Sequence, residues 1–120
     1  MQILIVDDSK AMRMIVMRTL KQTGLTGYRT CEAGDGAEAL QLITTQNPDL
    51  VLSDWNMPGM KGIDLLRQVR ESGRTTRFGF VTSESGTAIH NEAIAAGASF
   101  VVTKPFTPQA FEAALKPMFS

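Results

Sequence analysis

Short apolar runs alternate with longer segments of helical periodicity along the whole chain, and this alternation is the feature that most limits the fold. The runs, which we interpret as strands, are Ile3–Val6, Tyr28–Ala33, Leu50–Ser53, Phe78–Thr82 and Phe100–Thr103. The first, third and fifth are apolar almost without interruption, as expected of parallel strands that helices cover on both faces. The alternation therefore predicts an α/β domain.

The segments between the strands repeat their apolar residues every three or four positions, as helices with one buried face do. The first predicted helix, residues 10–23, has an apolar face of Met12, Ile15, Val16, Thr19 and Leu20. The second and third helices carry Ala37, Leu40 and Ile43, and Ile63, Leu66 and Val69. The fourth spans about residues 87–96. The fifth begins with Thr107 as N-cap and Pro108 as its first helical residue, and Pro117 ends it near Lys116.

Five strand-and-helix units in strict alternation favour one parallel sheet with right-handed crossovers. The common doubly wound order for five strands is 2-1-3-4-5, with five helices divided between the two faces, which is the flavodoxin-like arrangement. Such sheets bind ligands beyond the carboxyl ends of the strands, where the strand order reverses. The ends of the first and third strands flank that point, so a site is expected there.

Size and charge exclude several other classes of protein. The chain has 120 residues, which suits one domain over residues 1–120, and it has twelve basic and twelve acidic side chains. This balance argues against nucleic acid or an anionic membrane as the main partner, because both attract a concentrated positive surface. No signal peptide or membrane span is apparent. We expect a cytoplasmic protein in which Cys31 is a buried, reduced thiol.

Three carboxylates follow the strands that flank the predicted site. Asp7 and Asp8 come directly after the first strand, and Asp54 comes directly after the third. Anions this close repel one another, and a divalent cation removes the repulsion. Oxygen ligands without nearby His or Cys favour Mg²⁺, or Mn²⁺ in its place. Taken alone, Asp7 and Asp8 could equally be a charge pair at a helix N-terminus.

A hydroxyl and an ammonium are expected at the same edge of the sheet. The fourth strand ends at Thr82 and the fifth leads into Lys104. Donor groups of this kind, together with a metal, are what a phosphoryl group requires. An ionised aspartate can attack phosphorus without a general base, so the isolated Asp54 is the candidate phosphoacceptor.

Five motifs in one register resemble the receiver domains of response regulators, especially the stand-alone chemotaxis regulators of the CheY type. They are residues 6–8 (Val-Asp-Asp), 52–60 (Leu-Ser-Asp-Trp-Asn-Met-Pro-Gly-Met), 81–84 (Val-Thr-Ser-Glu), 96–99 (Ala-Gly-Ala-Ser) and 104–106 (Lys-Pro-Phe). The similarity covers the whole chain. It implies a two-component phosphorelay protein that is not an enzyme in its own right but assists its own phosphorylation and dephosphorylation.

The resemblance implies a role for each residue at the strand ends. Asp54 would receive its phosphoryl group from the phosphohistidine of a histidine kinase. Asp8 and Asp54 would bind Mg²⁺, with Asn56 contributing its backbone carbonyl and Asp7 acting through water. Thr82 would move toward the phosphoryl group on activation.

Lys104 would contact the phosphoryl group directly, and the bond before Pro105 would be cis. Asn56 and Glu84 lie two residues beyond Asp54 and Thr82, positions that affect the access of water in the family. We therefore expect a short-lived acyl phosphate. The alternative is that both are solvated loop residues.

Val101 departs from the family pattern, which usually has an aromatic residue three places before the lysine. Its neighbour Phe100 is expected on the opposite face of the sheet, because side chains alternate along a strand. The change leaves the chemistry at Asp54 intact and puts in doubt how Thr82 signals to the outer surface.

No output domain is expected, so the protein would act by binding a partner protein. It is expected to be a monomer. The family places the binding surface on the fourth helix, fifth strand and fifth helix, and a flagellar motor switch protein is the expected partner. Met14 and Met17 are predicted to project from the first helix. They are either a partner contact or ordinary exposed apolar residues.

Two other functions are compatible with the sequence. One is a phosphate sink or relay receiver without a motor partner, which Val101 favours. The other is an aspartyl-phosphate hydrolase of the haloacid-dehalogenase type, which needs a second aspartate two residues after the nucleophile. Asn56 occupies that position.

Overall fold

The computed structural model describes residues 1–84 and 86–119. The strands are β1 (Gln2–Val6), β2 (Arg29–Ala33), β3 (Leu50–Ser53), β4 (Arg77–Thr82) and β5 (Phe100–Thr103). The helices are α1 (Lys10–Lys21), α2 (Gly36–Gln46), α3 (Gly62–Glu71), α4 (Thr87–Ala95) and α5 (Pro108–Leu115), and a 3₁₀ helix (Lys116–Phe119) follows α5. The predicted alternation of strands and helices is therefore confirmed.

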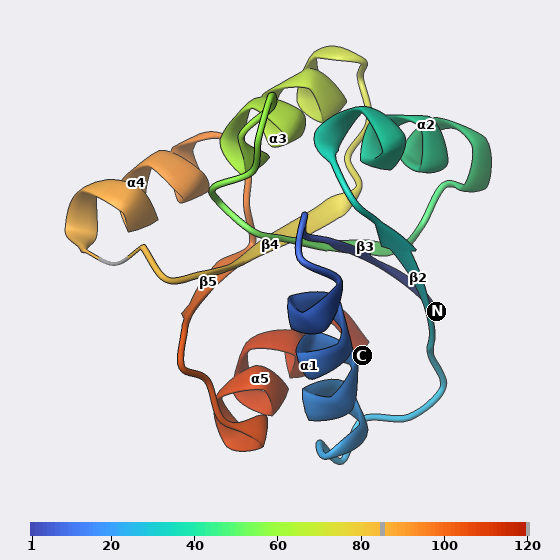
Figure 1. Ribbon diagram of the computed structural model, residues 1–120, viewed down its shortest axis with the longest axis vertical. Helices are drawn as coiled ribbons and strands as arrows, with labels where there is room; N and C mark the ends of the chain where they lie inside the picture. Colours follow the sequence, from blue (N-terminus) through green and yellow to red (C-terminus); the bar gives the residue numbers. More distant parts are fainter. Residues whose placement is uncertain (85, 120) are drawn as a thin grey trace.

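The five strands form one parallel sheet in the order β2-β1-β3-β4-β5, as the sequence predicts. Helices α1 and α5 cover one face and α2, α3 and α4 cover the other (Figure 1). Because β1 is a neighbour of both β2 and β3, the chain reverses direction across the sheet beside β1. The carboxyl ends of β1 and β3 thus lie next to each other.

Alternate residues of β1, β3, β4 and β5 pack into two separate apolar cores. Leu4, Val6, Val51, Phe78 and Phe80 face α2, α3 and α4. Ile3, Ile5, Leu50, Leu52 and Val81 face α1 and α5. Burial on both faces explains why the strands lack a polar alternation.

Side chains cap three of the helices. Ser9, Asp35 and Thr107 accept hydrogen bonds from backbone N–H groups in the first turns of α1, α2 and α5, which satisfies donors that have no partner within the helix. The predicted Thr107 N-cap followed by Pro108 is confirmed. Within the described ranges, no helix has the length and apolar character needed to cross a membrane.

Four predictions about individual side chains were wrong. Helix α1 ends at Lys21, two residues early, and it packs against β1 and α5 through Val16, Thr19 and Leu20. Ile15 lies about 100° around the helix from Val16 and is 44% exposed. Likewise, Ala37 is exposed because α2 packs through Ala39 and Ile43.

The other two errors concern packing at the edge of the α1 and α5 face. Met17 is half-buried against the core on that face, whereas Met14 is exposed as expected. Cys31 is half-buried rather than buried, because it lies on the edge strand β2. Its Sγ accepts a hydrogen bond from Gln2 Nε2 at 3.5 Å.

Gly62 allows α3 to start directly against the carboxyl end of β3. Its N–H donates to the Trp55 carbonyl at 2.9 Å. A Cβ at this position would lie 2.1 Å from the Asp54 carbonyl oxygen and 2.9 Å from the Phe80 ring. Position 62 therefore accommodates only glycine, because any side chain would clash with the backbone of Asp54.

We expect Gly62→Ala to destabilise the protein by about 3 kcal/mol, because backbone atoms must move to remove the clash. Urea denaturation followed by circular dichroism measures this difference. Gly34→Ala is the matched control, since its Cβ would meet only Arg13 Nη1 at 3.6 Å; we expect a change within about 0.5 kcal/mol. Equal stability of the two variants would contradict the packing argument.

Candidate functional site

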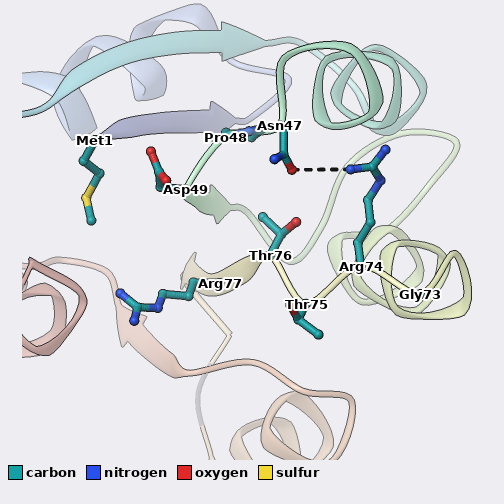
Figure 2. A pocket seen from close by; sticks show the side chains of 9 residues that line it. All are labelled: Met1, Asn47, Pro48, Asp49, Gly73, Arg74, Thr75, Thr76 and Arg77. Carbon is teal, nitrogen blue, oxygen red and sulfur yellow. Dashed lines mark hydrogen bonds between the residues drawn. The ribbon is translucent and has the colours of Figure 1, made fainter.

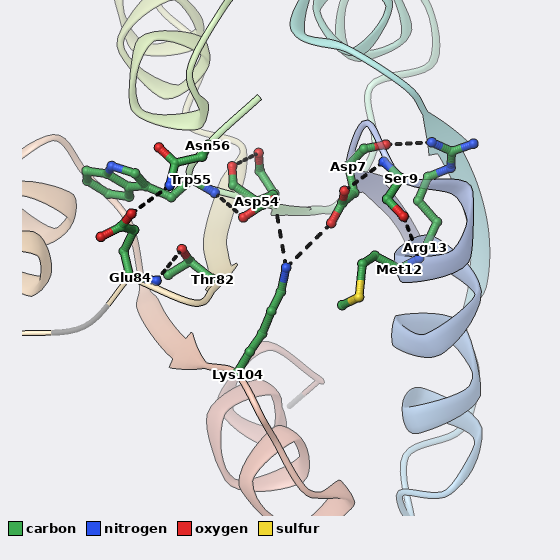
Figure 3. A network of polar contacts seen from close by, with 11 residues as sticks. Asp7, Ser9, Met12, Arg13, Asp54, Trp55, Asn56, Thr82, Glu84 and Lys104 are labelled. Carbon is green, nitrogen blue, oxygen red and sulfur yellow. Dashed lines mark hydrogen bonds and ion pairs between the residues drawn. The ribbon is translucent and has the colours of Figure 1, made fainter. Parts of the chain in front are cut away.

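Three carboxylates converge at the carboxyl ends of β1 and β3. Asp54 continues the pairing of the two strands, since its N–H donates to the Val6 carbonyl at 2.9 Å. One carboxylate oxygen from each of Asp7, Asp8 and Asp54 lies within 4.8 Å of the others. The crevice predicted from the strand order is therefore present, and Asp54 is seen in it beside Asp7 in Figure 3.

Asp7 is the buried member of the group and is only 4% exposed. Burial raises the pKa of its carboxyl, and the neighbouring Asp54 and Asp8 raise it further. The Ser9 N–H, which donates to Asp7 Oδ1 at 2.9 Å, and the Lys104 ammonium oppose that rise. An ionised Asp7 is thus held at a cost that a bound cation would reduce.

Lys104 extends from the end of β5 to the two inner carboxylates. Its Nζ lies 3.7 Å from Asp7 Oδ2 and 3.7 Å from Asp54 Oδ2 (Figure 3). Its backbone N–H donates to the Thr82 carbonyl at 2.7 Å, and the bond to Pro105 is cis, as the resemblance implies. These contacts hold the start of the β5–α5 loop against the crevice.

The charges and atoms at this edge fit a divalent cation. Three carboxylates face one ammonium, so two negative charges remain when all four groups are ionised. The ligand atoms are carboxylate oxygens, which suit Mg²⁺ better than Zn²⁺. The acidic crevice is therefore compatible with Mg²⁺.

The Asp54 carboxylate is oriented by its own backbone neighbourhood. Oδ1 accepts a hydrogen bond from the Trp55 N–H at 2.7 Å, and Oδ2 is the oxygen nearer to Lys104. The side chain is 14% exposed. Asp54 is thus fixed in direction yet reachable from the solvent.

A second polar network joins Thr82, Glu84 and Asn56 beside the carboxylates. Thr82 is fully buried, and its Oγ1 accepts a hydrogen bond from the Glu84 N–H at 3.0 Å. The Glu84 side chain accepts a hydrogen bond from Asn56 Nδ2 at 2.8 Å. Glu84 therefore contacts both of the other residues, a link that the sequence alone did not reveal.

Val101 and Phe100 lie on opposite faces of the sheet, as strand alternation predicts. Val101 packs against the core under α2, α3 and α4, and Phe100 packs on the α1 and α5 face. The Phe100 ring lies over Gly79, where a Cβ would come within 2.2 Å of it. Phe100 therefore cannot occupy the place of the missing aromatic residue.

Arg13 is a residue near the site that sequence reasoning missed. Its Nη1 donates to the Asp7 carbonyl at 2.5 Å and its Nε donates to Glu32 at 2.9 Å. These bonds connect α1 and β2 to the end of β1. Its place one turn after the Ser9 cap was the available signal, because that turn faces the strand end.

A pocket of about 570 Å³ opens at the opposite edge of the sheet, where the amino ends of the strands lie (Figure 2). Its charged side chains form hydrogen bonds with a neutral side chain or with the backbone. Arg74 contacts Asn47 Oδ1 at 3.4 Å, Arg77 donates to the Met118 carbonyl at 2.8 Å, and Asp49 accepts from the Gln2 N–H at 2.8 Å. The pocket therefore has the character of a structural junction.

A doubly wound sheet with an acidic crevice and a lysine at its carboxyl edge defines the class of phosphoacceptor signalling domains. The sequence model of the response regulator receiver domain matches residues 3–116. The chain is 43% identical to the chemotaxis protein CheY of Pseudomonas aeruginosa, over 99% of this chain and 96% of that protein. It is 39% identical to CheY-3 of Vibrio cholerae, over 99% of this chain and 92% of that protein.

Solved structures agree with these relatives. The chemotaxis protein CheY4 of Vibrio cholerae superimposes with a TM-score of 0.85 at 33% identity, covering 98% of this chain and 97% of that chain. The receiver domain of a response regulator NarL from Mycobacterium tuberculosis gives 0.83 at 32% identity, covering 98% and 94%. The chain belongs to the response regulator receiver family and is a phosphorylatable response regulator, a signalling switch.

We expect Asp7→Asn to raise the melting temperature in metal-free buffer at pH 7.5 by about 2–5 °C. A carboxyl whose folded pKa is raised above the ordinary 3.8 binds its proton more tightly in the folded state. Its ionisation therefore opposes folding increasingly as the pH rises from 3.8 through the folded pKa. Asparagine avoids this cost and retains Oδ1 for the Ser9 N–H.

Differential scanning calorimetry across the pH range measures the difference. The advantage of Asp7→Asn should vanish below about pH 4, where the aspartate is protonated in both states. Mg²⁺ should stabilise the wild type more than the variant. An unchanged or lower melting temperature at pH 7.5 would contradict our view of Asp7.

Proposed function

We propose that Asp54 accepts a phosphoryl group from the phosphohistidine of a histidine kinase, and that the phosphorylated chain then binds a partner protein in the cytoplasm. The observation that carries this proposal is the convergence of Asp54 with Lys104 and the Asp7–Asp8 pair. Asp54 combines access with orientation: its Oδ1 is bound by the Trp55 N–H, and Oδ2 is the oxygen nearer to Lys104.

The residues around Asp54 fit the requirements of phosphoryl transfer. An oxygen of the Asp54 carboxylate attacks phosphorus, a P–O bond forms, the P–N bond breaks, and the histidine imidazole leaves. Lys104 neutralises a phosphoryl oxygen and no longer has to balance the Asp54 charge. Because the groups are held by strand ends, little rearrangement is needed at the reacting atoms.

Asp8, Asp54 and the backbone carbonyl of Asn56 would hold Mg²⁺ or Mn²⁺, with Asp7 acting through water. The cation supplies charge neutralisation for the phosphoryl oxygens. The exposed Asp8 is accessible to an ion from solvent, and the buried Asp7 offers an oxygen close to it. A phosphoacceptor with these aids remains a switch and not an enzyme with a separate substrate.

We propose that Thr82 is the residue whose movement signals that Asp54 is phosphorylated. Its Oγ1 accepts the Glu84 N–H, so the hydroxyl hydrogen remains available to donate to a phosphoryl oxygen. Movement of Thr82 toward Asp54 would break the bond to Glu84. Since Glu84 also binds Asn56, the same movement would alter the residues that flank the phosphoryl group.

We expect wild-type protein incubated with acetyl phosphate and Mg²⁺ to gain the mass of one phosphoryl group, and Asp54→Ala to gain none, because the nucleophile is gone. Intact-protein mass spectrometry measures the gain. Asp64→Ala is the matched control, since Asp64 is an exposed carboxylate on α3, and it should be phosphorylated normally. A phosphoryl group on Asp54→Ala, or phosphorylation of the wild type at full rate in EDTA, would refute the proposal.

Asn56 and Glu84 are proposed to control the lifetime of the acyl phosphate, which we expect to be short. Their hydrogen-bonded side chains can hold a water molecule near the phosphorus. Asn56→Ala or Glu84→Ala should lengthen the half-life of the acyl phosphate by about threefold or more. The double variant should lengthen it by less than the product of the two single fold-increases, because the side chains act as a pair. A radiolabel decay assay decides this, and a wild-type half-life of hours would contradict it.

We propose a role in chemotaxis or flagellar motor control on the basis of the similarity to chemotaxis proteins named CheY. A flagellar motor switch protein is the expected partner, bound by α4, β5 and α5. Beryllofluoride, which mimics the phosphoryl group, should create affinity for this partner, and Asp54→Ala should abolish that effect. Isothermal titration calorimetry tests both.

A phosphate sink or relay receiver is the second candidate, and Val101 favours it. Val101 lines a groove of about 460 Å³ with Ile89, His90 and Thr103, in which valine leaves space beside α4. Without an aromatic side chain the signal from Thr82 has no large group to reposition. Absence of beryllofluoride-dependent binding to a flagellar motor switch protein, with normal phosphorylation at Asp54, would favour this second function over the first.

The hydrolase alternative has less support. The position two residues after Asp54 is the amide Asn56, and its Nδ2 donates to Glu84. An amide in that role cannot act as a general acid and base. Steady turnover of a phosphomonoester would overturn this conclusion.

A further inference from the structure

A groove between α1 and the edge strand β2 combines an apolar floor with a basic rim. It has a volume of about 680 Å³ and is lined by Met14, Met17, Arg18, Lys21, Tyr28, Arg29 and Thr30. Three of these residues are apolar or aromatic and three are cations. Among the described residues that line the groove there is no carboxylate. An ordinary solvated helix surface carries both signs of charge. A groove whose charged lining residues are all cations is therefore unusual.

The apolar floor begins on α1. Met14, Met17, Arg18 and Lys21 recur at the spacing of one helical stripe. Met14 is 50% exposed, whereas Met17 rests half-buried against the core and accepts a hydrogen bond from Thr30 Oγ1 at 3.6 Å. Methionine side chains are flexible and polarisable, which suits a surface that adapts to a partner.

The rim consists of Arg18, Lys21 and Arg29, all exposed. None of these side chains forms an ion pair or a hydrogen bond with another described residue. By contrast, Arg13 and Arg67, which lie elsewhere on the surface, are paired with Glu32 and Glu92. The three cations of the rim are therefore available to a partner.

The groove is remote from the phosphoryl chemistry. Arg18 and Lys21 lie in the last turn of α1, Arg29 is the first residue of β2, and Tyr28 directly precedes it. This is the edge of the sheet opposite to the carboxylates. Strand β2 and strand β5 are the two outer strands of the sheet (Figure 1). The groove is thus separate from the α4, β5 and α5 surface named above.

We propose that this groove binds an acidic, amphipathic helical segment of a partner protein, with a large apolar side chain seated over Met14 and Met17. Glutamate or aspartate side chains of that segment pair with Arg18, Lys21 and Arg29. Charge complementarity selects the partner, and the apolar contact holds it. The site is concave and carries only three cations, so a planar lipid surface would reach the rim without filling the floor.

The inference is independent of phosphorylation. Peptide binding should be the same in wild type and Asp54→Ala, with or without beryllofluoride. A failure of this binding leaves the phosphoacceptor function untouched, and a failure of phosphorylation leaves the groove untouched.

The probe is a fluorescein-labelled helical peptide with leucines at positions i and i+4 and glutamates on either side. Two matched peptides replace either the glutamates by glutamine or the leucines by serine. Fluorescence anisotropy with the full chain measures the affinity. We expect both replacements to weaken binding about tenfold or more, and we expect binding to weaken as salt rises from about 20 to about 150 mM.

Charge reversal of the rim tests the location. The double variant Arg18→Glu with Lys21→Glu should lose at least about tenfold in affinity for the acidic peptide. The control Lys61→Glu with Lys116→Glu changes the net charge equally at exposed positions outside the groove and should change the affinity less than about twofold. Because reversal at the end of α1 could disturb the helix, Met14→Ser provides a second test without a change of charge.

Circular dichroism confirms that each variant is folded, and nuclear magnetic resonance shift mapping locates the peptide. Shifts centred on Met14, Met17 and residues 28–30 would support the proposal. Equal binding of all three peptides, equal loss in the rim and control variants, or no binding of the acidic peptide would overturn it. So would binding of vesicles containing phosphatidylglycerol that depends on Arg18 and Met14 while the peptide does not bind.

Discussion

The mutual repulsion of carboxylates held side by side by β1 and β3 is the constraint around which the site is built. Val6 and Ser53 are partners in the sheet, so the residues that follow them, Asp7 and Asp54, lie side by side at its carboxyl edge. Burial of Asp7 makes this arrangement costly. The approach of the Lys104 ammonium from β5 offsets part of that cost.

Other parts of the structure serve to hold this arrangement. The glycine at position 62 allows α3 to begin against the Asp54 carbonyl, and the Trp55 N–H aims the carboxylate. Arg13 binds the Asp7 carbonyl from the side of α1. Each contact fixes the backbone beside Asp7 or Asp54, whose carboxylates lie close to each other. Burial of the two apolar cores offsets the destabilisation that the closely spaced carboxylates cause.

In the mechanism proposed above, the carboxylates and Lys104 take part in phosphoryl transfer, whereas a neighbouring group of residues transmits the signal. Glu84 binds Thr82 through its backbone and Asn56 through its side chain, so in our proposal a movement of Thr82 is felt at Glu84 and Asn56 together. Val101 and Glu84 line the same groove beside α4, and in our proposal the signal from Thr82 passes this way. The basic groove at α1 and β2 shares no lining residue with the Val101 groove, in keeping with our proposal that it binds a partner in either state of the switch.

Much of the fold could be predicted because parallel strands covered on both faces leave a distinct pattern. Continuous apolar runs identified β1, β3 and β5, and Thr107 with Pro108 marked the start of α5. Predictions failed where packing and not periodicity decides exposure, as at Ile15 and Met17. A helical stripe gives the direction of a face to within a residue, but the neighbouring elements, here α5, β1 and β2, determine which residue is covered.

The candidate site divides in the same way. The strand ends that carry Asp7, Asp8, Asp54, Thr82 and Lys104 could be predicted, because these residues directly follow or end the apolar runs. The burial and the mutual distances of these groups are properties of the folded chain. The burial of Asp7, the equal distance of Lys104 from two carboxylates, and the role of Glu84 depend on segments far apart in the chain, whose spacing no local pattern records.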